Sequence, residues 1–347
     1  MLDYLIIGHG LAGAVLSHEL LSAGKKVMVL NDPSLNSASR VAGGLYNPIT
    51  GRKMVKTWNA DKIFPVIEPF YSSLEEKLGT RFLYNIGIYR PFLSIEEQNE
   101  WQGKVSDYAP YVGHIFTSSR EEYCINDKFG GLHLTNAGYV DTRSLLSANK
   151  KYLLDKGSYR ELMFKDRQLE QANGRMKYAE LEFNRLIFCN GYNHVDNPWF
   201  DWLPFRPVKG EILTAELEIE ADTILNRGIF ILPVPDGKSR IGSTYNWKEI
   251  NNEPSDAGRK EIEEKLKNLY NGEYRIESVD AGIRPATKDR RPFIGLHPEN
   301  RQVGIFNGFG SKGVSLIPYY ARNFVDSLER DGELDEEVNI CRYFSLY

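Results

Sequence analysis

The chain has 347 residues, of which 41% are hydrophobic and 26% are charged, and its formal net charge is −4. This length predicts about two domains with a substantial core, and the composition is typical of a globular protein. The absence of a long basic run argues against the large phosphate-binding surface of a DNA-binding protein. The three cysteines, Cys124, Cys189 and Cys341, form neither a disulfide framework nor a metal-binding spacing.

No apolar stretch approaches the ~20 residues that a membrane-spanning helix needs. Met1 leads directly into the first predicted strand, which leaves no room for a signal peptide. The sequence therefore predicts a cytoplasmic protein without a membrane span, a metal site or a DNA partner. It leaves the oligomeric state open.

A strand, a glycine turn and a helix open the chain. The apolar run 5–7 leads into a G-x-G-x-x-G pattern, and a helical pattern follows. In this context the first glycine permits a tight turn, the second lets the backbone approach a pyrophosphate, and the third lets the helix pack on the strand. The helix N-terminus then faces the phosphates of a dinucleotide. The predicted phosphate-binding residues are Gly8, Gly10, Leu11, Ala12 and Gly13, with His9 as a spacer between them.

The next predicted strand, 26–32, should end in a side chain that binds a ribose hydroxyl. Asn31 occupies the usual acidic position, and Asp32 follows it, 19 residues after Gly13 (32 − 13). Either side chain can hydrogen-bond a hydroxyl, and neither carries the positive charge that a 2′-phosphate requires, so NADP is disfavoured. This unit alone leaves both NAD and FAD open.

The rest of the chain alternates between helical and β-rich segments. The first half predicts a packed small-residue loop at 37–48, a helix at 59–78 that is kinked or divided at Pro65 and Pro69, a strand at 81–91 and a helix at 95–105. A helix capped by Asp141 and ending at Gly157, a hairpin at 168–183 turning at Asn173-Gly174, and a buried strand at 185–189 follow. The second half predicts strands at 205–245 with a turn at Asp236-Gly237, a helix at 254–270, a strand at 302–306, a helix from Gly313 to about 330, and a solvated acidic tail from Asp331.

Several motifs occur in an order that points to one family. They are the opening glycine pattern, the loop Ala42-Gly43-Gly44-Leu45, the strand and turn at 186–191, the segment 206–211 (RPVKGE), and the block 282–295 (GIRPATKDRRPFIG) followed by Gly308-Phe309-Gly310-Ser311-x-Gly313. Together they resemble the D-amino-acid oxidase and glycine oxidase superfamily of FAD-dependent oxidoreductases. The resemblance runs from Leu2 to about Arg330.

This resemblance implies an α/β fold with a discontinuous, Rossmann-like FAD-binding domain of the GR2 type at 1–78, 135–202 and 284–347. An inserted, mainly antiparallel β-sheet substrate domain (α+β) occupies 79–134 and 203–283. The resemblance also implies tight, non-covalent FAD, because no cysteine or histidine stands where some relatives attach the cofactor. Beyond the opening turn, the implied FAD-binding residues are Asn31, Asp32, Ala42, Gly43, Gly44, Leu45, Asn190, Gly191, Arg284, Gly308, Gly310, Ser311, Lys312 and Gly313.

The implied reaction is oxidation of a C–N bond beside a carboxylate, by hydride transfer from a small amino acid or N-alkyl amino acid to flavin N5. In the resembling family an arginine at the position of Arg284 forks onto the substrate carboxylate, a role that suits guanidinium geometry. Phe230 stands where relatives often carry a tyrosine over the substrate. Tyr245 and Trp247 can line the same cavity, although strand alternation excludes all three side chains from it together.

Two further cations near these motifs have less certain roles. Lys312 is either a cation beside the flavin pyrimidine edge or a solvated loop charge. Arg240 is expected to point to solvent. The sequence leaves open the substrate side chain, its stereochemistry, and whether oxygen or a carrier reoxidises the flavin.

Alternative functions remain after this interpretation. The superfamily includes a domain that oxidises a carboxymethylaminomethyl group on the wobble uridine of tRNA, and the segment 45–48 (LYNP) is loosely similar to that branch. The net charge of −4 and the lack of a basic cluster disfavour an RNA substrate. A flavin-binding subunit that is active only within a complex is a further alternative, and an NAD-dependent dehydrogenase is the weakest.

Overall fold

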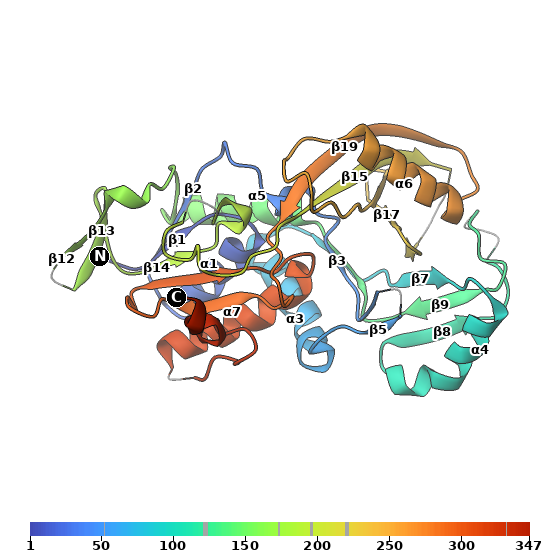
Figure 1. Cartoon of the computed structure of the whole chain (residues 1–347), viewed down its shortest axis with the longest axis horizontal. Coiled ribbons are helices and arrows are strands. Elements are labelled where there is room, and N and C mark those ends of the chain that lie inside the picture. The colour runs from blue at the N-terminus through green and yellow to red at the C-terminus, as the bar shows by residue number, and fades with distance from the viewer. Residues whose placement is uncertain (52, 121–123, 173, 195–196, 219–221, 331) are drawn as a thin grey trace.

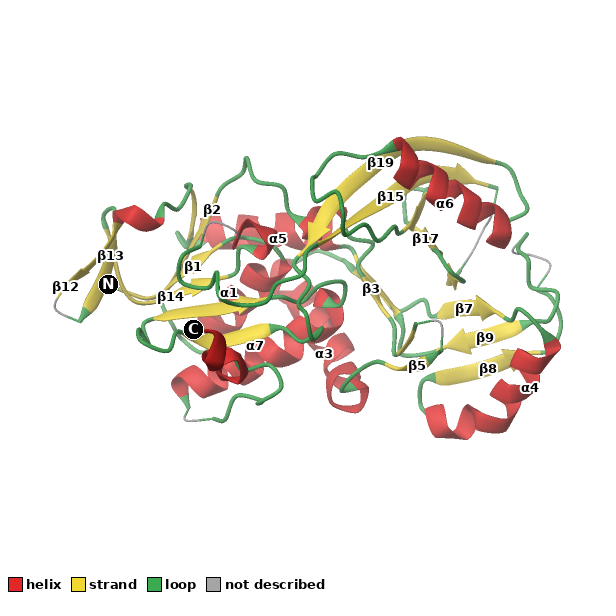
Figure 2. Cartoon of the chain, viewed as in Figure 1, coloured by secondary structure: helices red, strands yellow, loops and turns green. Residues whose placement is uncertain are grey.

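The computed structural model describes residues 1–51, 53–120, 124–172, 174–194, 197–218, 222–330 and 332–347. Figure 1 shows β1, β2 and β14 with helices α1, α5 and α7 in one half of the molecule, and β15, β17 and β19 with β7, β8 and β9 in the other half. Figure 2 shows that helices cover the strands of the first half, whereas the second half is mostly strand.

The first sheet has a parallel centre. Its strand order is β11-β2-β1-β14, and β21 pairs with β14 on the far side in the same parallel direction. The central strands are apolar runs that are buried along most of their length, as parallel strands covered on both faces require. Their bounds are β1 Leu2–Ile7, β2 Val27–Asn31, β11 Tyr159–Glu161, β14 Leu181–Phe188 and β21 Val303–Asn307. Antiparallel β20 (Phe293–Leu296) pairs with β21, and the hairpin β12 (Leu169–Ala172) and β13 (Arg175–Tyr178) extends β14.

Helices pack against this sheet and against each other. Helix α1 (Leu11–Ser22) contacts both α5 (Thr142–Asp155) and α7 (Gly313–Glu329), and α7 also contacts α3 (Ala60–Leu78). The carboxylate of Asp141 caps α5 by accepting from the backbone N–H groups of Arg143 and Ser144, which confirms the predicted cap.

The second sheet has eight strands in the order β19-β15-β18-β17-β16-β7-β9-β8. Every pair is antiparallel except β16 with β7. Its strands are β7 Ile88–Pro91, β8 Val112–Phe116, β9 Gly131–Leu134, β15 Val208–Leu217, β16 Ile224–Asn226, β17 Phe230–Pro233, β18 Ser239–Gly242 and β19 Tyr274–Arg284. Helix α6 (Asp256–Leu269) packs its apolar side on one face of β15 and β18, and the other face is turned toward the site described below.

Short elements connect the two sheets. A three-stranded sheet of β3 (Leu45–Tyr46), β10 (Gly138–Val140) and β6 (Leu83–Tyr84) lies between them, and β4 (Ile49–Thr50) pairs with β5 (Val55–Lys56). Helix α2 (Ala38–Val41) contacts β19, and α4 (Ile95–Lys104) begins at the cap Ser94. The small-residue loop at 37–48 is therefore packed, as predicted.

Two predicted elements differ in the structure. The strand predicted at 81–91 is two short strands in different sheets, β6 and β7, because the chain turns at Gly87 with φ +68°. The helix predicted to kink or divide at its prolines is not divided, because α3 continues through both of them, and the predicted kink stays a prediction. Pro65 and Pro69 both lie on its exposed side, where water can satisfy the carbonyls that lose their N–H partners.

The prediction of a solvated tail is wrong. Residues Val338 and Ile340 are fully buried, and Val338 accepts a hydrogen bond at 3.0 Å from the backbone N–H of Ile294 in β20. Arg342 adds an ion pair with Asp289 at 3.0 Å. The predicted hairpin at 168–183 is present as β12 and β13, but its turn residue Asn173 lies outside the described residues.

Candidate active site

The carboxyl ends of β1, β14 and β21 meet at one edge of the first sheet, where open α/β sheets bind ligands. Gly8 follows β1 with φ +101°, and a Cβ there would lie 2.8 Å from the carbonyl oxygen of Cys189 at the end of β14. A Cβ on Gly13 would overlap the carbonyl oxygen of Gly8. Gly10, the residue before α1, has no side chain to cap the helix, and the backbone N–H of Leu11 donates to Oγ of Ser39 at 3.1 Å. The next N–H groups of the first turn, those of Ala12 and Gly13, are the ones that can bind an anion.

Asn31 and Asp32, which the sequence left as alternative ribose-binding residues, have different hydrogen-bond partners in the structure. The side-chain oxygen of Asn31 accepts a hydrogen bond at 2.9 Å from the backbone N–H of His9, so Asn31 supports the phosphate turn itself. Asp32 accepts from the N–H and hydroxyl of Ser34 through Oδ1, at 2.9 and 2.7 Å. Its Oδ2 is buried without a hydrogen-bond partner in the described residues. A ligand hydroxyl would satisfy that oxygen, which makes Asp32 the better candidate for a ribose contact.

His9 is buried and serves the turn as an uncharged group. Its Nε2 lies 2.8 Å from the side-chain oxygen of Asn149 on α5. Burial lowers the pKa of His9 to about 4, so the imidazole is neutral at pH 7. This agrees with its predicted role as a spacer.

The loop at 42–45 packs closely against Val140 on one side and against Phe230 of the second sheet on the other. A Cβ on Gly44, which has φ +73°, would overlap the carbonyl oxygen of Val140. A Cβ on Gly43 would lie 2.8 Å from Cζ of Phe230 in the second sheet. Only glycine allows this loop to pass so close to both neighbours.

Arg240 holds the loop in place, which corrects the prediction that it points to solvent. Its Nη1 donates to the carbonyl of Ala42 at 2.7 Å, and its Nη2 donates to the carbonyl of Val41 at 2.6 Å. Burial lowers the pKa of Arg240 to about 10. Both partners lie about 200 residues away in the sequence, so no local pattern indicates the contact.

A second glycine turn links β21 to α7. The side-chain amide of Asn307 donates to the carbonyl of Gly191 at 2.9 Å, which joins the ends of β14 and β21. Gly308 and Gly310 have φ values of +82° and +55°, and α7 then begins at Gly313 without a side-chain cap. Ser311 is exposed.

Lys312 is half-buried at the start of α7. Burial lowers its pKa, and the nearby Arg291 and Arg290 lower it further. The helix N-terminus and these cations make this turn suitable for an anionic group.

Arg284 ends β19 and lies across β15. A Cβ on Gly210 would overlap its guanidinium, which explains the glycine in the RPVKGE motif. Nη1 donates to the carbonyl of Thr244 at 3.1 Å, and Nη2 donates to Oγ of Ser243 at 2.7 Å. Burial lowers its pKa, and no carboxylate among the described residues forms an ion pair with it. A cation that is fixed by neutral partners can bind an incoming carboxylate.

The aromatic candidates occupy different positions. Phe230 is half-buried between Gly43 and Gly242, so it lies at the boundary of the two sheets. The ring of Tyr245 is 49% exposed and its centroid lies 4.4 Å from Cζ of Arg284. Trp247 is 65% exposed beside Tyr245. Tyr245 therefore lies against Arg284, whereas Phe230 faces Gly43 and Gly242.

A buried ion pair on the opposite face of β15 fixes the segment that carries Tyr245. Nζ of Lys209 lies 3.3 Å from Oε1 of Glu211, and both side chains are 1% exposed. Lys209 donates to Asn251 at 2.9 Å, and Glu211 accepts from the N–H and hydroxyl of Ser255. The RPVKGE motif alone does not indicate this role, because the partners Asn251 and Ser255 lie more than 40 residues downstream.

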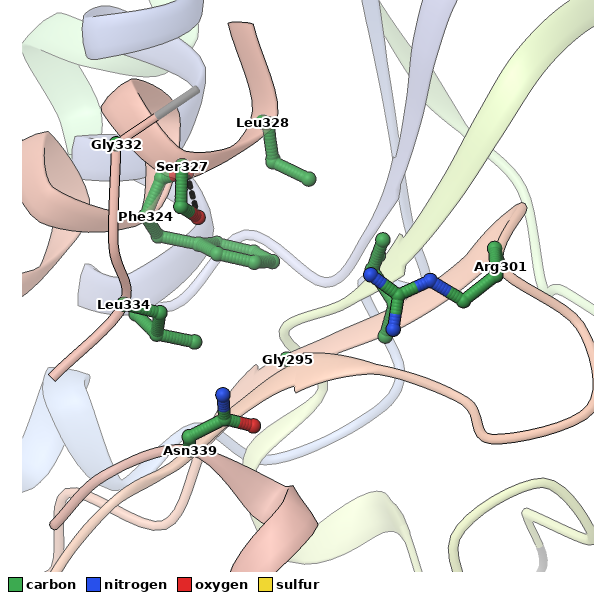
Figure 3. Close-up of a pocket in the computed structure, with 9 residues that line it drawn as sticks. Gly295, Arg301, Phe324, Ser327, Leu328, Gly332, Leu334 and Asn339 are labelled. Carbon is green, nitrogen blue, oxygen red and sulfur yellow. Dashed lines mark hydrogen bonds between the residues drawn. The ribbon is translucent and has the colours of Figure 1, made fainter. Parts of the chain in front are cut away.

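The pocket in Figure 3 lies away from these residues. It has a volume of about 200 Å³ and is formed where α7 and the C-terminal tail pack on β20. None of its lining residues belongs to the predicted site, and the figure shows Arg301 and Asn339 on opposite sides of it.

Comparison with known proteins identifies the family. The model of the family described as FAD-dependent oxidoreductase matches residues 3–327. The chain belongs to this family. Glycine oxidase from Bacillus licheniformis is 30% identical over 128 residues, which cover 36% of this chain and 35% of that protein. The matched region is thus about a third of the length of that relative.

Two other relatives widen the comparison. The crystal structure of iminodiacetate oxidase from Chelativorans sp. BNC1 superposes with a TM-score of 0.83 at 18% identity, covering 98% of both chains. The tRNA 5-methylaminomethyl-2-thiouridine biosynthesis bifunctional protein MnmC of Marinobacter nauticus is 25% identical over 140 residues, which cover 36% of this chain and 22% of that protein.

These findings confirm the family, the fold class, the FAD cofactor and an oxidoreductase enzyme. The site fits FAD, since the glycine cradle at the start of α1 and the unsatisfied Oδ2 of Asp32 match a pyrophosphate and a ribose. None of the helices in the described residues is both long and apolar enough to cross a membrane. The individual cofactor contacts and the roles of Arg284, Phe230 and Tyr245 stay predictions.

Proposed function

We propose that this enzyme oxidises the C–N bond of a small amino acid or N-alkyl amino acid. The observation that carries the proposal is Arg284, a buried cation held by Ser243 and Thr244 and without an ion-pair partner in the described residues. A substrate carboxylate would complete its charge. Relatives named glycine oxidase and iminodiacetate oxidase support a substrate that bears a carboxylate beside an amine.

When bound, FAD accepts a hydride from the carbon next to the substrate nitrogen. Arg284 would bind the carboxylate and so orient this carbon, and Phe230 would form an apolar wall that excludes water. The positive turn at Lys312 and the start of α7 would stabilise negative charge on the reduced cofactor. The substrate must react as the neutral amine, because a protonated amine has no lone pair to support loss of hydride.

We also propose the division of the chain into an FAD-binding domain at 1–78, 135–202 and 284–347 and a substrate domain at 79–134 and 203–283. The composition of the two sheets supports it, since the β7–β9 strands and the β15–β19 strands belong to one sheet. FAD would lie between that sheet and the ends of β1, β14 and β21.

The substitution Arg284→Lys or Arg284→Met tests the proposal. Loss of a charge-assisted, forked contact should raise the KM for the best substrate at least ~10-fold. FAD content should stay normal. The matched control is Arg259→Met, which removes an exposed arginine on α6 and should leave both quantities unchanged. An unchanged KM in the Arg284 variants would contradict the proposed role.

A second candidate function is oxidation of a carboxymethylaminomethyl group on the wobble uridine of tRNA. The partial similarity to the Marinobacter nauticus protein favours it, and the chemistry at the C–N bond would be the same. The net charge of −4 weighs against an RNA substrate. Bleaching of the flavin by modified tRNA, and by no free amino acid, would favour this candidate.

A further inference from the structure

Arg90, on β7 of the second sheet, is a buried cation that the proposed reaction does not use. Its side chain is only 9% exposed, and its Nε is buried without a partner in the described residues. No described carboxylate forms an ion pair with it. Burial lowers the pKa of Arg90 to about 10, Arg227 lowers it further, and the nearby Glu97 carboxylate opposes this by raising it. An unpaired buried charge is costly, so its presence points to a ligand that neutralises it.

The charges around Arg90 do not balance. Glu97, at the start of α4, faces this region, but it is paired with Arg227 at 2.8 Å. Arg227 and Arg90 both lower the pKa of the Glu97 carboxyl. Two guanidinium groups thus share one carboxylate, which leaves a net positive charge.

The strand register places Arg90 on the same face of the sheet as the proposed substrate site. Phe230 in β17 pairs with Asn226 in β16. The parallel pairing of Leu225 with Tyr89 makes Asn226 and Arg90, the next residue on each strand, neighbours in the same row. Residues in one row project to the same face. Phe230, Asn226 and Arg90 therefore form a row across β17, β16 and β7, with the backbones of Phe230 and Arg90 about 10 Å apart by two strand spacings.

The partial solvent exposure of Asn226 and Phe230, in the row that contains Arg90, supports access for a ligand to this row. Ile88 and Ile224, one step back toward the core, are fully buried, whereas Asn226 and Phe230 are half-buried. Arg284 lies on the same face, on the other side of Phe230. Its guanidinium lies over Gly210, and Ile212, two residues farther along β15, lies beside Gly242 and Phe230 on that face. Two arginines without carboxylate partners in the described residues thus flank one apolar wall.

We propose that Arg90 binds a second acidic group of the substrate. The preferred substrate would be an amino acid whose N-substituent or side chain ends in a carboxylate. This inference rests on the proposed function, in which Arg284 binds the carboxylate beside the reacting C–N bond.

The test compares wild-type holoenzyme with Arg90→Met and Arg90→Lys on two matched substrate series. One series is glycine carrying N-carboxymethyl, N-(2-carboxyethyl) and N-(3-carboxypropyl) groups, and the other carries N-ethyl, N-propyl and N-butyl groups. Wild type should have a KM at least ~10-fold lower for the best carboxylated substrate than for its uncharged match. Arg90→Met should reduce this preference to about twofold or less and leave the KM values of the uncharged series unchanged, with Arg90→Lys between the two.

A thermal melt separates binding from structure. Removing an unpaired buried charge should leave the Tm of Arg90→Met equal to or above that of wild type. A lower Tm with equal KM changes in both series would show a structural role and overturn the proposal. So would the absence of any preference for a carboxylated substrate in wild type.

The failure of the proposed function has a different signature. If no member of either series, nor glycine itself, reduces the flavin of wild type, the proposed function fails. If the uncharged series reacts and depends on Arg284 while carboxylated substrates show no advantage, only the role of Arg90 fails.

Discussion

The two proposed sites are built by different means: the FAD site lies at the ends of β1, β14 and β21 (the FAD end), and the substrate site lies on the second sheet (the substrate sheet). At the FAD end, residues 8–13 shape the turn with backbone atoms, and glycines keep side chains out of the way. On the substrate sheet, the side chain of Arg284 from β19 lies over Gly210 of β15 and donates to the side chain of Ser243, just after β18. A site made of backbone is visible in a short stretch of sequence, whereas a site made of side chains depends on strand register.

The largest expected effect is at the FAD end. In Gly13→Ala the new Cβ would overlap the carbonyl oxygen of Gly8, which is a backbone group that cannot move aside cheaply. We expect the purified variant to contain little or no FAD, measured by flavin absorbance per protein. Gly103→Ala is the matched control, because no atom lies within 4 Å of a Cβ there, and it should keep full FAD content. Full FAD content in Gly13→Ala would contradict a phosphate site at this turn.

A glycine on the substrate sheet should have a smaller and different effect. Gly210→Ala would push the guanidinium of Arg284 out of its position over β15. We expect the KM for a carboxylate-bearing substrate to rise about 10-fold, since a charge-assisted contact is lost, while FAD content stays normal. Equal losses of FAD and of substrate binding would show that the two ends are not separable.

A further effect concerns acid stability, and it belongs to the FAD end alone. The pKa of buried His9 is lowered to about 4 from 6.5, so the unfolded state binds a proton first as the pH falls. Stability from this group is complete above pH 6.5 and is lost as the pH falls toward 4. Between pH 7 and pH 5 the loss is about 2 kcal/mol.

The variant His9→Gln cannot titrate and should lose less stability over this range. The measurement is urea unfolding with saturating FAD at both pH values, for wild type and for the variant. Parallel losses in the two proteins would show that His9 does not carry this acid sensitivity.

The sequence predicted the fold well where short motifs specify backbone. The glycine pattern, the capped helix at Asp141 and the turn at 308–313 are present where they were predicted. It failed where distant residues decide. Arg240 looks like a solvent-facing strand residue until the loop at 41–42 is folded against it. Two apolar residues in an acidic tail, Val338 and Ile340, gave too weak a signal to predict its docking on β20.

The residues of the candidate site show the same difference between what short motifs predict and what only distant contacts decide. Asn31 and Asp32 were equivalent candidates in the sequence, and only the hydrogen bond from His9 to Asn31 separates them. Arg284 was predicted through its family motif rather than from its own neighbours. Arg90 carried no sequence signal, because its proposed role rests on burial and on the Nε partner that it lacks in the described structure.

The most direct test of the central claim is the visible spectrum of the purified protein, before and after anaerobic addition of glycine, sarcosine, proline and D-amino acids. We predict the absorbance of oxidised flavin, and its bleaching by at least one of these carboxylate-bearing amines. A yellow protein that none of them bleaches would contradict amino-acid oxidation. A colourless protein that does not take up added FAD would contradict the cofactor site itself.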